Sequence, residues 1–517
     1  MAGLQRTRSP ILRRHPLSAA SHAGGIRVRQ RRRKSATARI AAQLVRQQLR
    51  HLQRWQPVVV DDRAALEDGG GFDLRFPGGS TSDQYHWDGQ YPAYAQSKGW
   101  SNWSASWAVS TAQYMKLVRQ IDSIPLITAN YGYAKNDTTA TDGNVTNAAR
   151  LAADWVEYCN APNDGSNPNG GTDWAARRAA DGSPEAYAVR YWEVGNEVFG
   201  SWETGFESNG SAYAENFNVI ADAMKAVDPT IAVGLVVDPS SNGQAWTPAV
   251  LSHPGTAQRA DFLIAHTYFT QFGSAAGVTV SNLFAMSKQV GDLKAALDAH
   301  VTKNTARNPA ELPYYLGEYN VPGPSNSLQV SLASGLFIAK VLGELATGGW
   351  AAASLWDVLN GYDSPGTYGA GDHGFLSQGQ PNVPDFTPRP TYYPFYFFTH
   401  GFGDHLLAST SSDALVSVYA SSFTGGGVGL VLVNEAAEPR TASISIAGAS
   451  LAGQANAWIL SGPSAEGAAV TLNGIASGSA AGGSPPESVT PYTLTVSNSA
   501  VLSVDLPAWS VANLVAR

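Results

Sequence analysis

The feature that most constrains the fold is a regular alternation of short apolar segments with longer helical segments between residues 72 and 358. Strands alternating with helices form parallel βα units, so this pattern predicts an α/β fold. The predicted strands are Phe72–Pro77, Pro125–Tyr131, Tyr191–Glu197, Ile231–Val237, Asp261–Phe269, Tyr314–Asn320 and Ala352–Val358. The predicted helices, which carry spaced apolar positions, are Thr111–Gln120, Asn147–Tyr158, Ser211–Val227, Leu283–His300 and Ser331–Leu345.

Seven clear strands fall one short of the eight that a closed (β/α)8 TIM barrel requires. We expect the missing strand to precede Phe72. Pro57–Val60 is a weak candidate for it, and the segment before that offers nothing better. We therefore expect a (β/α)8 catalytic barrel over residues 57–404, whose first strand is not clearly visible in the sequence.

From about His405 onward, short strands follow one another without helices between them. Strands of this kind, separated by turn-forming residues, indicate an antiparallel β-sandwich, which we expect over residues 405–517. The predicted strands are Leu415–Tyr419, Gly427–Asn434, Thr441–Ile446, Ala455–Leu460, Tyr492–Val496 and Ala500–Leu506.

The charge is unevenly distributed along the chain. Residues 1–54 hold thirteen Arg, one Lys and no acidic residue, so all 41 acidic residues lie in the rest of the chain. The acidic body argues against a nucleic-acid partner, since phosphates would be repelled. We expect residues 1–56 to be a disordered basic leader, and a misassigned start, a transit-type leader and a functional nucleic-acid arm remain open for it. It lacks the apolar stretch of a secretory signal.

Several other classes of protein and site are excluded by the sequence. A single cysteine, Cys159, allows neither a disulfide framework nor a cysteine zinc site, and no HExxH motif occurs. We therefore expect neither a metal nor a cofactor. No apolar run approaches the length of a membrane-spanning helix, so no membrane partner is expected. Nothing in the sequence indicates the oligomeric state.

Two glutamates, Glu197 and Glu318, end strand-like segments that would be strands 4 and 7 of the barrel. Barrel enzymes carry their catalytic groups at the carboxyl ends of strands, and strands 4 and 7 face one another across the barrel mouth. Cleavage of a glycosidic bond needs such a pair, one carboxyl protonated and the other ionised. The sequence therefore predicts a glycoside hydrolase.

Several short motifs accompany the two glutamates. They are RFPGG (Arg75–Gly79) with the following YHW (Tyr85–Trp87), WVEYCN (Trp155–Asn160), YWEVGNE (Tyr191–Glu197) and EYN (Glu318–Asn320). Together they resemble the retaining (β/α)8 glycoside hydrolases of clan A, and most closely the α-L-arabinofuranosidases of glycoside hydrolase family 51. The resemblance covers roughly residues 70–510.

This resemblance implies Glu197 as the general acid/base and Glu318 as the nucleophile, with Asn196 on the hydroxyl next to the anomeric carbon. It further suggests roles for five more residues, which stay expectations here. Arg75 would keep Glu318 ionised, Tyr268 would donate to Glu318, and His266 would contact the sugar or the acid/base. Asn130 and Trp356 would line the sugar site, Trp356 as a stacking platform.

The implied activity is retaining hydrolysis of cell-wall polysaccharide or its oligosaccharides, with carboxyl groups about 5–5.5 Å apart. A cell-wall substrate would also place the protein outside the cell. An endo-β-glucanase or xylanase of the same superfamily is one alternative reading, and a non-catalytic carbohydrate-binding barrel is another.

Overall fold

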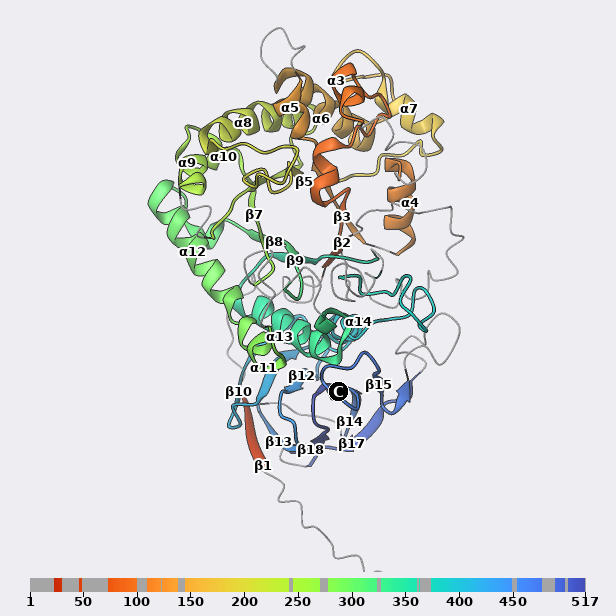
Figure 1. The fold of residues 1–517 in the computed structure, drawn as a ribbon, viewed down its shortest axis with the longest axis vertical. Coiled ribbons are helices and arrows are strands. Elements are labelled where there is room, and N and C mark those ends of the chain that lie inside the picture. The colour runs from red at the N-terminus through yellow and green to blue at the C-terminus, as the bar shows by residue number, and fades with distance from the viewer. Residues whose placement is uncertain are drawn as a thin grey trace, which may run out of the picture.

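The computed structural model describes residues 23–29, 46–48, 73–99, 109–121, 123–137, 145–240, 245–269, 278–322, 327–359, 362, 373–448, 453–476, 489–497 and 501–516. It consists of a barrel and a strand-rich C-terminal unit. Helices α13 (Leu332–Gly348) and α14 (Tyr392–His400) lie between these two parts (Figure 1).

Parallel strands form a closed barrel in which each pairs with the next along the chain and the last pairs with the first. The barrel strands are β2 (Arg46–Gln48), β3 (Asp73–Phe76), β4 (Ile124–Ala129), β5 (Tyr191–Val194), β6 (Ala232–Val236), β7 (Phe262–Thr267), β8 (Tyr314–Tyr319) and β9 (Ala352–Leu355). This arrangement confirms the predicted barrel and all seven of the strands expected within it.

The first barrel strand differs from its prediction. Strand β2 lies in the basic N-terminal segment and pairs with both β3 and β9, whereas the candidate Pro57–Val60 lies outside the described residues. Strand β1 (Ala23–Arg29) also falls in this segment. The expectation of a disordered leader is therefore wrong for these two segments. The basic composition of residues 1–56 gave no sign of strands. Their formation depends on pairing with strands elsewhere in the fold rather than on a local apolar pattern.

Helices surround the barrel, and some of them begin at residues that the sequence marks as helix caps. The helices on the barrel are α3 (Ala93–Ser97), α4 (Thr111–Gln120), α5 (Gly132–Asn136), α6 (Val145–Asn160), α7 (Trp174–Ala180), α8 (Gly210–Val227), α9 (Trp246–Ser252), α10 (Thr256–Arg259), α11 (Val280–Met286) and α12 (Gln289–Asn304), with 3-10 turns η1 (Gly79–Gln84), η4 (Pro309–Glu311) and η5 (Ser327–Val330). Helix α4 begins with a capping box between Ser110 and Gln113.

The helix predicted over Leu283–His300 is two helices, α11 and α12. They separate at Ser287, a buried residue whose hydroxyl donates to the carbonyl of Phe284 instead of facing solvent. A serine that bonds to the nearby backbone competes with helix continuation, which accounts for the break.

The C-terminal strands form one continuous, largely antiparallel path that folds around its own apolar core, in agreement with the predicted sandwich. The strands are β10 (His405–Ser411), β11 (Val416–Ser422), β12 (Val428–Asn434), β13 (Arg440–Ala447), β14 (Gln454–Ser461), β15 (Thr471–Leu472), β16 (Ile475–Ala476), β17 (Tyr492–Thr495), β18 (Val501–Leu506) and β19 (Ser510–Ala516). Strand β1 joins this path between β10 and β13, parallel to β13.

Strand β12 shows how the two parts are joined. All of its residues are buried, and they alternate between two cores: Leu430 and Leu432 face the interior of the sandwich, whereas Val431 and Val433 pack in the core shared with the barrel. A strand covered on both faces reads as a continuous apolar run, as this one does. Among the described residues, no helix is both long and apolar enough to cross a membrane.

Replacing Lys340 by methionine is expected to lower the free energy of unfolding by about 3 kcal/mol, because it removes the cation that pairs with the largely covered carboxylate of Glu435. Lys340, on α13, is 5% exposed, and its Nζ lies 2.7 Å from Oε1 of Glu435. Denaturant titration measures the loss. Lys294→Met is the matched control, because Lys294 pairs with Asp298 nearer the surface and should contribute less than about 1 kcal/mol. Equal losses in both variants would contradict the prediction.

Candidate active site

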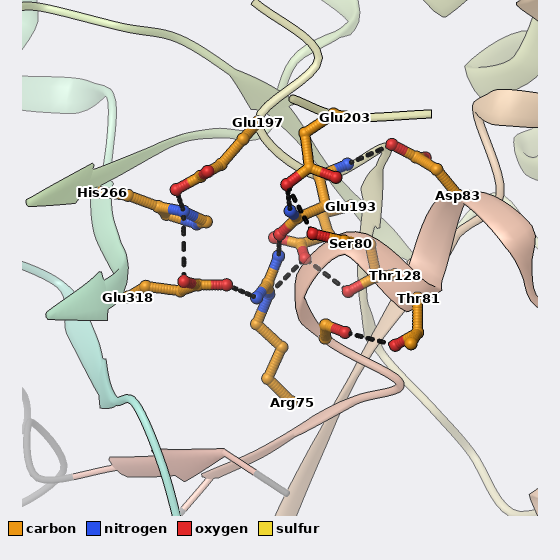
Figure 2. A network of polar contacts seen from close by, with 12 residues as sticks. Arg75, Ser80, Thr81, Asp83, Thr128, Glu193, Glu197, Glu203, His266 and Glu318 are labelled. Carbon is orange, nitrogen blue, oxygen red and sulfur yellow. Dashed lines mark hydrogen bonds and ion pairs between the residues drawn. The ribbon is translucent and has the colours of Figure 1, made fainter. Parts of the chain in front are cut away.

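Arg75, at the end of β3, is the centre of a buried polar network (Figure 2). Its side chain is fully buried, and its guanidinium donates to three different side chains. Nη1 lies 2.9 Å from Oε1 of Glu318, Nη2 lies 2.8 Å from Oδ1 of Asn196, and Nε donates to Glu193. Burial alone would lower the pKa of Arg75, but the charges and hydrogen bonds of the two glutamates raise it above its ordinary value.

Glu318 lies within β8, close to its carboxyl end, and is 2% exposed. Its Oε1 accepts from Arg75, and its Oε2 accepts from the hydroxyl of Tyr268 at 2.9 Å. The predicted contacts of Arg75 and Tyr268 with this glutamate are therefore present. A carboxylate that receives one charged and one neutral donor is stabilised as an anion, which is the state a nucleophile needs.

Glu197 follows β5 in a loop with an unusual backbone. Its own φ is 44°, and Gly195 two residues earlier has φ 80°. A Cβ on Gly195 would lie 2.6 Å from Val198 and 2.8 Å from Tyr131, so only glycine fits the tight approach there. This turn directs the Glu197 carboxyl over the barrel mouth, where its side chain remains 16% exposed.

Two nitrogen donors contact the Glu197 carboxyl. Nδ1 of His266, on β7, lies 2.8 Å from Oε1, and the indole Nε1 of Trp202 donates to Oε2 at 2.9 Å. His266 therefore makes the contact with the predicted acid/base that the sequence suggested. Trp202 is 60% exposed, so this glutamate is held at a position that solvent and a substrate can reach.

His266 lies between the two glutamates in Figure 2. Its Nδ1 is also 3.8 Å from Oε2 of Glu318, and one ligand atom from each of the three side chains lies within 4.8 Å of the others. This trio is compact enough to hold a metal ion. The sequence predicts no metal, and it predicts the two glutamates as an acid/base and a nucleophile, which the imidazole of His266 would then bridge.

Asn196 is fixed at its backbone and at both ends of its side-chain amide. Its backbone N–H lies 3.4 Å from Oδ2 of Asp83, its Oδ1 accepts from Arg75, and its Nδ2 donates to Oε1 of Glu203 at 3.2 Å. The residue is 1% exposed. Such a fixed amide presents a defined donor and acceptor to whatever occupies the space between the glutamates.

Asn130 and Trp356, the other two predicted site residues, make different contacts. The amide of Asn130 donates to the carbonyl of Tyr85 at 3.2 Å and accepts from the N–H of Tyr133 at 2.9 Å, so it supports the loops after β3 and β4. The side chain of Trp356 is fully buried, and its carbonyl accepts from Asn320. Their roles in sugar binding stay predictions.

Sequence reasoning missed four acidic or hydroxyl side chains of this network: Glu193, Glu203, Asp83 and Ser80. Glu193 lies on β5, in the same motif as Glu197. It could have been found from the alternation of side chains into and out of the barrel along that strand. Asp83 and Glu203 lie in a 3-10 turn and a loop, where no local pattern marks an inward-facing carboxyl.

The two missed loop carboxyls have strongly perturbed acidities. Burial raises the pKa of Glu203 to about 9, with further contributions from the charges of Glu197, Asp83 and Glu318. Burial also raises the pKa of Asp83 to about 7, against hydrogen bonds from the backbone of Tyr131, Asn196 and Gly132. Clustered perturbed carboxyls of this kind are typical of catalytic sites.

Known proteins share both the motifs and the fold of this chain. Residues 70–278 match the model of the "Alpha-L-arabinofuranosidase 1 domain". This part of the chain is therefore similar in sequence to the α-L-arabinofuranosidase domain. The matched residues include β3 to β7, and with them Arg75, Asn196, Glu197 and His266. The match thus covers most residues of the polar network, whereas Glu318 lies outside it.

The relatives named after this activity are distant and matched over part of their length. A "Probable alpha-L-arabinofuranosidase C" of Aspergillus clavatus is 29% identical over 185 residues, which are 35% of this chain and 32% of the relative. An "Intracellular exo-alpha-(1->5)-L-arabinofuranosidase 1" of Bacillus subtilis is 27% identical over 206 residues, which are 38% of this chain and 36% of the relative. The matched region spans about a third of these relatives.

A solved structure resembles this chain over nearly its whole length. The GH51 arabinofuranosidase from Xanthomonas axonopodis pv. citri superimposes with a TM-score of 0.70 at 18% identity, over 96% of this chain and all of that one. At this identity the likeness concerns the fold, and it extends the agreement from the barrel to the C-terminal sandwich.

Proposed function

We propose that this chain is a retaining glycoside hydrolase that releases α-L-arabinofuranosyl units from polysaccharides or oligosaccharides. The observation that carries the proposal is the pairing of Glu197 with Glu318, whose nearest oxygens lie within 4.8 Å of one another. Retaining enzymes hold their carboxyl groups about 5–5.5 Å apart, whereas inverting enzymes need about 6.5–9.5 Å to admit a water molecule.

The environments of the two glutamates support different roles. Glu318 accepts hydrogen bonds from Arg75 and Tyr268 and is nearly inaccessible, which suits a nucleophile that must be ionised. Among the described residues, Glu197 is contacted by the indole of Trp202 and the imidazole of His266, and it reaches the open side of the site. This environment suits a group that exchanges protons with a leaving group and with water.

The reaction then runs in two displacements. In the first, an oxygen of Glu318 forms a bond to the anomeric carbon, and the glycosidic C–O bond breaks as its oxygen takes the proton of Glu197. In the second, Glu197 removes a proton from water, whose oxygen bonds to the anomeric carbon as the ester to Glu318 breaks. Each step inverts the anomeric carbon, so the overall configuration is retained.

Asn196 supplies the third element of the proposal. Its amide lies beside the nucleophile and is fixed by Arg75 and Glu203. A hydrogen bond from this amide to the hydroxyl next to the anomeric carbon strengthens as charge develops in the transition state. The arrangement therefore favours rate as well as binding.

A screen of aryl glycosides tests this function. We expect kcat/KM for 4-nitrophenyl α-L-arabinofuranoside to exceed that for the β-xyloside, β-glucoside and β-galactoside by at least about tenfold. Nuclear magnetic resonance of the sugar released early in the reaction should show the substrate's anomeric configuration. Preferred cleavage of a β-glucan or xylan would favour a glucanase or xylanase, and sugar binding without turnover of any substrate would reduce the chain to a binding protein.

A further inference from the structure

Glu203 is a buried carboxyl that the double-displacement reaction does not use. It lies six residues after Glu197 in the same loop and is 6% exposed. Its Oε1 accepts two hydrogen bonds, from the hydroxyl of Ser80 at 2.8 Å and from Nδ2 of Asn196 at 3.2 Å. Figure 2 shows it between Glu197 and Asp83.

The contacts of Glu203 determine which way the amide of Asn196 points. Arg75 has only donors, so it engages the amide oxygen, and Glu203 then accepts from the amide nitrogen. A half-turn of the amide would place an NH2 group against the guanidinium and an oxygen against the oxygen of Glu203. The contact with the guanidinium would become repulsive, and Oε1 of Glu203 would lose the N–H that it accepts, so the two neighbours together favour one orientation.

We propose that Glu203 is a positioning residue that holds the side chain of Asn196 in its catalytic orientation by accepting a hydrogen bond from Nδ2. This inference rests on the proposed function, because it concerns the residue expected to contact the sugar hydroxyl. With Nδ2 directed toward Glu203 and Oδ1 toward Arg75, the second N–H of the amide and the free lone pair of its oxygen remain for the substrate.

Glu203 performs this role as a neutral acid. The charged groups that face it are Glu197 in its own loop, Asp83 on η1 and Glu318 on β8, all of them carboxyls. An ionised Glu203 would add another negative charge to this group, and burial together with these neighbours raises its pKa to about 9. The carbonyl oxygen of a protonated carboxyl accepts hydrogen bonds without that cost.

Two variants separate positioning from chemistry. Glu203→Gln keeps a neutral acceptor at the same place, so we expect kcat/KM for the aryl arabinofuranoside to stay within about threefold of the wild type. Glu203→Ala frees the Asn196 amide, so we expect kcat to fall by about 10- to 100-fold with KM nearly unchanged. Glu207→Gln, in the same loop but paired with Lys135, is the matched control and should leave kcat unchanged.

A double-mutant cycle tests whether Glu203 acts through Asn196. In an Asn196→Ala background, Glu203→Ala should cost less than about threefold, because the group it positions is already absent. Independent, multiplicative losses would overturn the proposal. So would a Glu203→Gln variant as impaired as Glu203→Ala, which would give the carboxyl a chemical role, or a fully active Glu203→Ala.

Thermal unfolding supplies a test that does not depend on turnover. The pKa of Glu203 is about 9 in the folded protein and near its ordinary 4.5 in the unfolded chain. The contribution of its protonated carboxyl to the free energy of unfolding is therefore complete below pH 4.5 and is lost as the pH rises toward 9. Replacing it by Gln removes this dependence, so the Tm of Glu203→Gln should rise relative to the wild type between pH 5 and about pH 9.

The same experiment keeps the two proposals apart. If the wild type cleaves no arabinofuranoside, the proposed function fails, and the positioning role is then judged on Tm alone. It stands if the Tm losses of Asn196→Ala and Glu203→Ala at pH 7 are non-additive, and it falls if they add. A constant Tm difference across the pH series would overturn the neutral state.

Discussion

The Glu318→Ala variant is expected to lose kcat on the aryl arabinofuranoside by on the order of 10⁴-fold. The reason is the covalent step: without the carboxylate that Arg75 and Tyr268 hold, no side-chain oxygen is available to bond to the anomeric carbon. KM should change little, since the variant still contains Asn196 and the rest of the sugar site. Initial rates over a range of substrate concentrations measure both constants.

The controls for this variant separate chemistry from folding. Glu311→Ala changes an exposed glutamate on η4, just before β8, and should keep full activity. Glu318→Gln retains oxygen and nitrogen near Arg75 and Tyr268 but offers no anionic nucleophile, so it should be as inactive as the alanine variant. Circular dichroism should show both variants folded. Hydrolysis that persists in Glu318→Ala would remove Glu318 from the mechanism.

The parts of the site that were predictable lie at the ends of strands. Arg75, His266 and Glu318 lie on or at the end of strands whose apolar patterns are visible in the sequence, and a barrel brings such ends to one face. The contact between Arg75 and Glu318 spans 243 positions, yet it follows from strand order alone. Once a barrel is assumed, the strand pattern therefore indicates which residues far apart in the sequence lie at the same end of the barrel.

The parts that were not predictable depend on tertiary pairing. Strand β2 has no apolar pattern, and its place is set by its neighbours β3 and β9. Helix α14 is rich in aromatic residues and contains Pro394, so local propensity does not indicate a helix there; the proline is tolerated because it lies in the first turn. Glu203 lies in a loop, so no strand periodicity predicts where its side chain points. Its carboxyl points into the network because it accepts hydrogen bonds from Ser80 and Asn196.

The activity of the Glu197→Ala variant is expected to depend on the leaving group and to be restored by azide. An activated aryl leaving group needs no proton, so the first displacement should proceed and the ester on Glu318 should accumulate because no base activates water. We expect kcat to fall by about 10²- to 10⁴-fold, with a burst of aryl alcohol in the first turnover. The loss should be larger for poorer leaving groups.

Azide should restore turnover in this variant, because a small anion needs no general base and can enter the space left by the carboxylate. Its nitrogen bonds to the anomeric carbon as the ester to Glu318 breaks, so the product is an arabinosyl azide with the configuration of the substrate. The same anion offered to Glu318→Ala reaches the anomeric carbon from the nucleophile's side and should give the opposite configuration. The two configurations, read by nuclear magnetic resonance, therefore assign each glutamate to its face of the sugar, and identical products from both variants would contradict the assignment.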